Sequence, residues 1–129
     1  MAGLFTINVG GIMESRAEIK SGKKTGTTTT AYVEALRVDT RGCGVEGLTL
    51  LLLKNTGATY DLLYKVDGYP YDVDGTLSGL SYAEKAETTL AQATQVLIDV
   101  SQGYAALVVS VMNAETTNAT TYQLDWTTY

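Results

Sequence analysis

The chain has 129 residues, of which 45% are hydrophobic and 18% are charged. This length fits a single domain, and the chain is too apolar and too weakly charged to be disordered. The net charge of −5 argues against nucleic acid as a partner, because phosphate binding needs a basic surface. The chain has no histidine and one cysteine, Cys43, so the commonest general base and the usual zinc ligands are missing. We therefore expect no enzyme activity and no cofactor.

Targeting signals are also absent from the sequence. Its first residues lack the charged start and the long apolar stretch of a signal peptide. The apolar run at residues 48–53, which Thr49 interrupts, is far shorter than the roughly 20 residues that cross a bilayer. We expect a protein that folds in a cytosol and has no membrane partner.

An apolar segment and a polar segment begin the chain. Residues 4–9 alternate in polarity with a period of two, which is typical of a strand with one buried face. Residues 12–19 fit either a strand or a short helix, and residues 21–30, SGKKTGTTTT, predict a flexible linker. The expected organisation is an N-terminal arm or added strand over residues 1–20, this linker, and a folded domain over residues 31–129.

The rest of the chain predicts a β-protein, because it is rich in threonine and tyrosine, which favour strands. One helical turn is expected within residues 81–87. The expected strands cover residues 32–38, 48–54, 60–66, 88–90, 96–100, 105–112 and 120–126. Short strands with turns about every 8–12 residues are typical of a sandwich. The predicted fold is a single antiparallel β-sandwich of about seven to eight strands, jelly-roll or immunoglobulin-like, with an N-terminal extension.

Alternation along these strands assigns one residue in two to the core. The run at residues 48–54 is nearly continuously apolar, and we assign its Leu50 and Leu52 inward. The other expected core residues are Leu62, Tyr64, Ile98, Leu107, Val109, Leu124 and Trp126.

The long loop after residue 66 contains two candidate binding sites. Asp67, Asp72 and Asp74 form a weak calcium candidate, because carboxylate oxygens are the ligands that calcium prefers. The alternative is a turn in which these side chains bond their own backbone. A second candidate is a set of tyrosines that stack on a sugar or anchor a partner; the alternative is that they cover the end of the sandwich. These tyrosines are Tyr69, Tyr71 and Tyr82.

Two stretches of the chain contain turn and strand motifs that are similar to those of known structural proteins. LLLLKNTGATYDLLYKVDGYP contains an Asn-Thr-Gly turn and a Tyr-Lys-Val strand, and VLIDVSQGYAALVVSVMNAETTNATTYQLDW ends in a Tyr-x-Leu-x-Trp strand. Over residues 32–126 the chain resembles small β-sandwich structural proteins of tailed-phage virions: head decoration or cement proteins and tail or fibre modules. The resemblance implies a virion protein that is assembled in the host cytoplasm and binds the major capsid protein or another virion protein. It assigns no role to an individual residue.

The apolar arm needs a partner surface, because exposed it would promote aggregation. The segment either returns to its own sandwich as an added strand or lies on a neighbouring subunit. We expect a homo-oligomeric capsid decoration protein that stabilises a shell through such contacts. The alternative is a tail or fibre module that binds carbohydrate or a host receptor through the loop tyrosines. The expected interface residues of the arm are Leu4, Phe5, Ile7, Val9, Ile12 and Met13.

Overall fold

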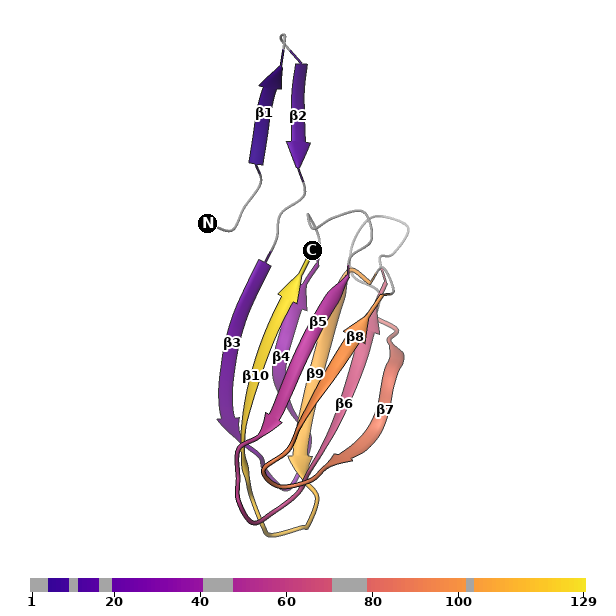
Figure 1. Ribbon diagram of the computed structural model, residues 1–129. Helices are drawn as coiled ribbons and strands as arrows, with labels where there is room; N and C mark the ends of the chain where they lie inside the picture. Colours follow the sequence, from indigo (N-terminus) through magenta and orange to yellow (C-terminus); the bar gives the residue numbers. More distant parts are fainter. Residues whose placement is uncertain (1–4, 10–11, 17–19, 41–47, 71–78, 102–103) are drawn as a thin grey trace.

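A computed structural model describes residues 5–9, 12–16, 20–40, 48–70, 79–101 and 104–129. The strands are β1 (Phe5–Val9), β2 (Ile12–Arg16), β3 (Lys20–Thr27), β4 (Val33–Asp39), β5 (Thr49–Asn55), β6 (Leu62–Tyr69), β7 (Tyr82–Leu90), β8 (Gln95–Val100), β9 (Ala106–Asn113) and β10 (Thr121–Thr128). Strands β3 to β10 form two sheets of four strands that pack face to face (Figure 1). Within these described ranges, no helix is long and apolar enough to cross a membrane.

The order of the strands identifies the fold. One sheet has the order β3-β10-β5-β8 and the other β4-β9-β6-β7, and all neighbours in each sheet are antiparallel. The first of these eight strands therefore pairs with the last, the second with the seventh, the third with the sixth and the fourth with the fifth. A long hairpin rolled up in this way is a jelly roll. The expected antiparallel sandwich is confirmed, and it is a jelly roll rather than an immunoglobulin-like fold.

The segment expected to be a linker is instead mostly the edge strand β3. It pairs with β10 along all eight of its residues. Its glycines lie against the aromatic rings of β10: a Cβ atom at Gly22 would be 2.9 Å from the ring nitrogen of Trp126, and one at Gly26 would be 2.5 Å from the hydroxyl of Tyr122. These rings supply the apolar contact that the side chains of β3 lack. The sandwich therefore begins at β3 and not at residue 31.

The segment expected to hold a helical turn is the edge strand β7. Its alanine and glutamate residues favour a helix, but tertiary contacts often override this weak preference. Here the backbone pairs with β6, with register shifts in the middle of the strand. Most residues of β7 are exposed.

The core lies between the two sheets. Six of the expected core residues are confirmed as buried: Leu62, Tyr64, Ile98, Leu107, Val109 and Leu124. Trp126 is only partly buried, although it packs against the core.

The expected phase of β5 is wrong. Leu51 and Leu53 are the fully buried residues, whereas Leu50 and Leu52 lie half-buried on the outer face. A continuous apolar run has no alternation from which the inward face can be chosen.

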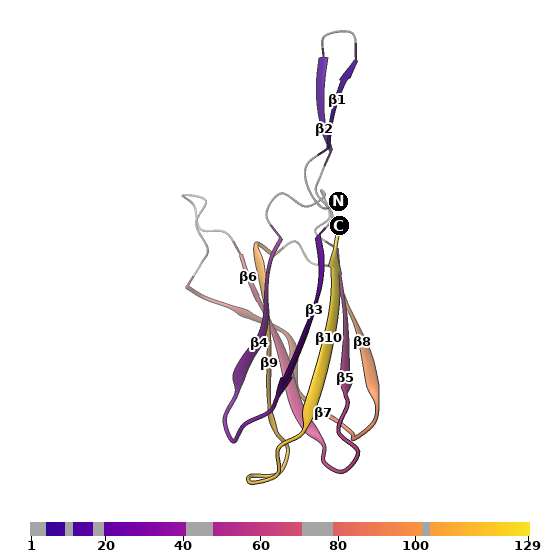
Figure 2. The same cartoon turned by 90° about the vertical axis from the view of Figure 1, so that its left-hand side faces the viewer.

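The N-terminal strands β1 and β2 form a hairpin. They pair from Phe5 opposite Arg16 to Val9 opposite Ile12, and neither strand joins a sheet of the sandwich. Figures 1 and 2 show the hairpin beyond the end of the sandwich at which the C-terminus lies. Within the described residues 5–9 and 12–16, the segment therefore adds no strand to either sheet.

At the opposite end, buried hydrogen bonds tie the sheets together. The side-chain amide of Asn55 donates to the carbonyl oxygen of Leu90, at the end of the other sheet, at 3.2 Å. Its own oxygen accepts from the Thr120 hydroxyl at 2.8 Å. The Thr28 hydroxyl donates to Oδ1 of Asn113 at 2.6 Å. We call the four side chains Thr28, Asn55, Asn113 and Thr120 the polar clamp; all four are buried.

Replacing Asn55 with alanine should lower the free energy of unfolding by at least about 2 kcal/mol, because buried groups left without a partner cost roughly 1–3 kcal/mol each. Urea denaturation measures the change. Thr56→Ala is the matched control, since its hydroxyl bonds Thr121 in an exposed position, and it should change stability by less than about 0.5 kcal/mol. Equal losses in the two variants would contradict the role of the polar clamp.

Candidate interaction surfaces

Three tyrosines lie near the end of the sandwich that faces the hairpin, and two of them are in contact. Tyr69 ends β6, Tyr82 begins β7 and Tyr104 precedes β9. The rings of Tyr82 and Tyr104 stack with their centres 6.4 Å apart. The guanidinium carbon of Arg37 lies 5.7 Å from the centre of the Tyr69 ring. Since Tyr82 is 64% exposed, its ring is available to a partner.

The tyrosines expected to bind a ligand or a partner were Tyr69, Tyr71 and Tyr82, and their role stays a prediction. Tyr69 is half-buried, Tyr82 is exposed, and Tyr71 lies outside the described residues. Tyr104 was missed, because only the fold brings it to this place. A Cβ atom at Gly68 would lie 2.4 Å from the ring of Tyr104, so the absence of a side chain there makes room for the ring.

Tyr104 is held in place by two hydrogen bonds. Its hydroxyl donates to a carboxylate oxygen of Glu84 at 2.7 Å. Its carbonyl oxygen accepts from the Thr40 hydroxyl. The ring of Tyr104 is therefore bonded to β7, and its backbone is bonded to Thr40, the residue that follows β4.

Only one of the three aspartates of the calcium candidate lies among the described residues. Asp67 lies half-buried in β6, and Asp72 and Asp74 fall outside the described residues. Among the residues that are described, no three potential ligands gather around one point. Calcium binding at this loop stays a prediction.

Charged side chains on the outer face of the β4-β9-β6-β7 sheet bond one another. The Tyr32 hydroxyl donates to Glu87 at 2.6 Å, and the ammonium group of Lys65 lies 4.5 Å from the centre of the Tyr32 ring. Arg37 forms an ion pair with Glu34 at 2.8 Å. Each of these side chains therefore has a partner within the molecule.

The outer face of the β3-β10-β5-β8 sheet has a different character. Leu50 and Leu52 are half-buried there, and Leu97 of β8 is 64% exposed. The strand register places Leu97 opposite Leu52. We call Leu50, Leu52 and Leu97 the aliphatic patch. Exposed groups of large apolar side chains commonly mark contact sites.

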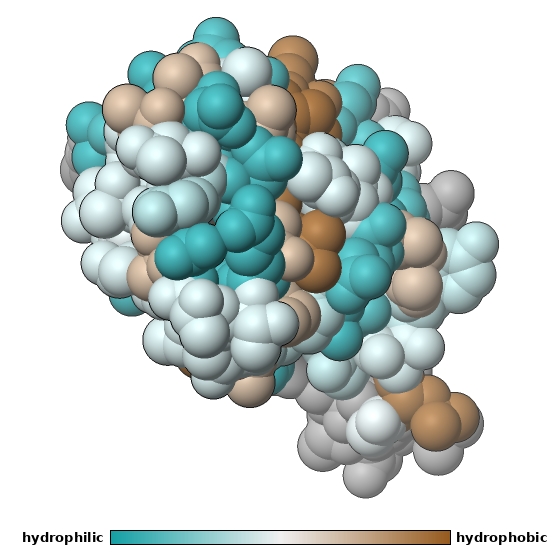
Figure 3. Space-filling model, turned by 90° about the horizontal axis from the view of Figure 1, so that it is seen from below, coloured by the Kyte–Doolittle hydropathy of each residue, from teal (hydrophilic) through white to brown (hydrophobic). Residues whose placement is uncertain are grey.

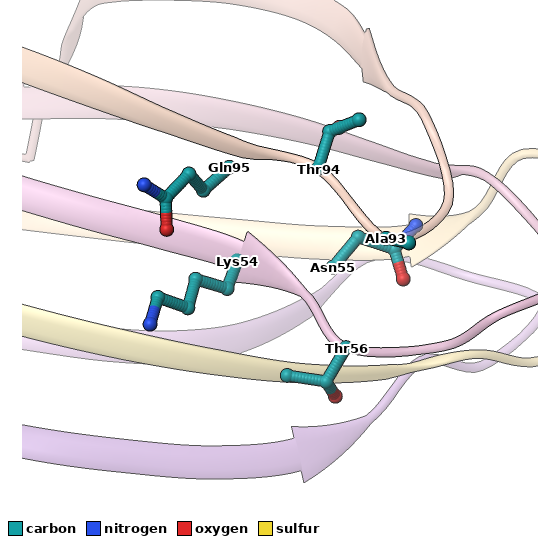
Figure 4. Close-up of a pocket in the computed structure, with 6 residues that line it drawn as sticks. All are labelled: Lys54, Asn55, Thr56, Ala93, Thr94 and Gln95. Carbon is teal, nitrogen blue, oxygen red and sulfur yellow. The ribbon is translucent and has the colours of Figure 1, made fainter.

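The hollows of the surface are shallow. The first, of about 380 Å³, lies where β5 meets the β7–β8 turn (Figure 4) and is lined by Lys54, Asn55, Thr56, Ala93, Thr94 and Gln95. Asn55 belongs to the polar clamp, so its polar atoms are already used. A second hollow of about 270 Å³ lies between the loops at residues 57–60 and 119–121. Figure 3 views this end, where hydrophilic and neutral residues surround small separate apolar patches.

A third hollow, of about 210 Å³, lies between the edge strands β7 and β8. Leu97 and Asp99 line it from β8, and Glu84 and Lys85 line it from β7. This hollow therefore combines an exposed leucine with charged groups from both sheets.

Comparison with known proteins gives a fold but no family. No family model and no curated protein matches the chain. The Yersinia pseudotuberculosis-derived mitogen is similar in structure with a TM-score of 0.54 and 14% identity, over 85% of this chain and 86% of that one. At this identity the similarity shows a shared fold alone.

Two other solved structures score lower. A structure of the disulfide-linked pili of Bacillus endospore appendages has a TM-score of 0.49 and 11% identity, over 85% of each chain. A structure of infectious bursal disease virus has a TM-score of 0.49 and 9% identity, over 91% of this chain and 33% of that one.

Alkaline pH should destabilise the protein through two tyrosines. Burial, followed by the hydrogen bond to Glu87 and the charge of that carboxylate, raises the pKa of Tyr32 well above its usual value. Burial and Glu84 raise the pKa of Tyr104 in the same way. The folded protein therefore keeps these protons when the unfolded chain has lost them. The stabilisation is complete below the unfolded pKa of about 10 and is lost as the pH rises above it.

We expect the free energy of unfolding to fall above about pH 10, and to fall less steeply in a Tyr32→Phe, Tyr104→Phe variant. Urea denaturation at a series of pH values measures both slopes. The same slope in the variant and the wild type would show that these two tyrosines are not the cause.

Proposed function

We propose that the protein is a non-enzymatic structural component of a virion, a capsid decoration protein that binds a shell and neighbouring copies of itself. The observation that carries the proposal is the β1–β2 hairpin, whose strands pair with each other and join neither sheet. A two-stranded hairpin alone is only marginally stable in water. A partner surface would supply the contact that the hairpin lacks.

Five of the six residues that the sequence analysis assigns to this contact lie in the two strands of the hairpin. Phe5, Ile7 and Val9 lie in β1, and Ile12 and Met13 lie in β2; Leu4 lies outside the described residues. The role of all six stays part of the proposal.

Energetics favour a repeated surface over a single binding event. Burying a large apolar side chain contributes roughly 1.5–3 kcal/mol, whereas ordering each backbone residue costs roughly 1–2 kcal/mol. One arm would therefore bind weakly. Many arms on one shell would bind tightly together through avidity.

The fold is compatible with this role. Jelly rolls are common in viral capsid and lectin domains, and the sequence resembles sandwich proteins of phage particles. Because a fold does not determine a function, the proposal rests on the hairpin and not on the fold.

A second candidate function follows from the exposed ring of Tyr82, which is stacked on Tyr104. Sugars stack on aromatic faces of this kind, so a tail or fibre module that binds carbohydrate is the alternative. Under this alternative, Tyr82→Ala would abolish binding in a glycan array without changing any association with capsids.

Deleting residues 1–19 removes the hairpin and leaves β3 complete. We expect the truncated sandwich to fold with an unchanged urea midpoint, because the hairpin joins neither sheet. Its co-sedimentation with purified tailed-phage capsids, or its mass in solution, should fall. A variant with Phe5, Ile7 and Val9 changed to asparagine keeps the chain length and should lose the same binding.

Two results would contradict this proposal. The truncated chain would unfold if the hairpin were an intrinsic part of the sandwich. Unchanged mass and unchanged capsid binding would show that the hairpin makes no contact with a partner.

A further inference from the structure

The sandwich has two lateral sides, each formed by one edge strand of each sheet. Strands β3 and β4 lie together on one side, and β7 and β8 lie together on the other (Figure 1). An edge strand presents backbone N–H and C=O groups on which another strand can pair. Natural proteins commonly protect such edges with bulges and charges.

Bulges are present at both edges of one sheet and absent from the edges of the other, where β3 carries three lysines and β8 carries one aspartate. In the β4-β9-β6-β7 sheet, both edge strands have register shifts: β4 between Glu34 and Leu36, and β7 opposite Tyr64 to Asp67. The edge strands β3 and β8 of the other sheet pair in continuous register over eight and six residues. Strand β8 also contains no proline or lysine and exposes Leu97.

The two regular edges run in opposite directions, because they are the first and last of four antiparallel strands. Figure 1 shows β3 running away from the hairpin and β8 running toward it. A second copy rotated about an axis along the strands would therefore place its β3 antiparallel to β8 of the first. The sheet would continue from one copy to the next without a change of pattern.

Charge favours the same pairing. The β3/β4 side has four cationic and two acidic residues, a net charge of +2: Lys20, Lys23, Lys24, Arg37, Glu34 and Asp39. The β7/β8 side has one cationic and three acidic residues, a net charge of −2: Lys85, Glu84, Glu87 and Asp99. Opposite potentials on facing surfaces steer association and exclude like sides.

We propose that the β8 edge of one copy binds the β3 edge of a second copy, head to tail, so that the β3-β10-β5-β8 sheet continues between subunits. Leu97 is the apolar centre of this contact. The inference deepens the proposed function, because it names one of the contacts between copies that the function requires.

Such a contact leaves a β3 edge and a β8 edge at the ends of each pair, and repetition gives a ring or a filament. Rotation about an axis along the strands keeps every hairpin at the same end of the assembly (Figures 1 and 2). The hairpins would then act together on one surface, as avidity requires.

The test begins with Leu97→Lys in the full-length chain. Position 97 is exposed, so folding should be unaffected. The new ammonium group would face the lysines of β3, and we expect the dissociation constant of self-association to rise at least about tenfold. Sedimentation velocity over a range of concentrations measures it. Thr116→Lys, which adds the same charge at an exposed loop residue, should associate like the wild type.

A mixing experiment tests the polarity of the contact. Lys23→Glu, Lys24→Glu disables the β3 edge and keeps β8, whereas Leu97→Lys disables the β8 edge and keeps β3. Each variant alone should sediment as one 13.8 kDa chain, and an equimolar mixture should form a one-to-one dimer. A head-to-head contact between like edges would give no such rescue.

The inference is overturned if Leu97→Lys assembles like the wild type, or if the wild type stays monomeric at high micromolar concentration. It is also overturned if Leu97→Lys self-associates normally but loses capsid binding, because β8 would then contact a virion protein and not a second copy. The asparagine variant of the hairpin separates the two proposals. If that variant keeps lateral self-association but its capsid binding is unchanged, the proposed function fails while the edge contact stands.

Discussion

The pairing of the first sandwich strand with the last is the interaction on which the rest of the structure depends. Strand β3 is held on β10 because Gly22 and Gly26 leave space for the rings of Trp126 and Tyr122. This pairing closes the jelly roll and places the hairpin at the end where the C-terminus lies. It also makes β3, a strand with three lysines and no acid, an edge of the sheet whose other edge is β8.

The two outer faces of the sandwich differ in the side chains that they present. One face bonds its own charges, through Tyr32 with Glu87 and Arg37 with Glu34. The other has the aliphatic patch and two edges in regular register. The polar clamp holds the sheets together at the far end, and the hairpin joins neither sheet. The hairpin, the aliphatic patch and the open edges are the parts on which the proposed assembly depends.

Sequence patterns correctly predicted the buried residues of strands that alternate in polarity. They missed the features that arise only from contact with a neighbouring strand. The period of two in β6 and β10 correctly placed Leu62, Tyr64 and Leu124 in the core. The four consecutive leucines at residues 50–53 did not indicate which face of β5 points inward, because an unbroken apolar run does not alternate. Strand β3 was predicted to be a linker. Its apolar contacts come from the rings of β10, so the composition of β3 itself does not indicate a strand. Tyr104 and Leu97 gained their importance only from neighbours that are distant in the sequence.

Hydrogen exchange of the full-length protein at low and high concentration tests the central claim most directly, because it reports on backbone amides without any substitution. We expect amides of β3 and β8 to exchange more slowly at high concentration, while those of β4 and β7 stay unchanged. Exchange that is independent of concentration in all four edge strands, or protection confined to β4 and β7, would contradict assembly through the β3-β10-β5-β8 sheet.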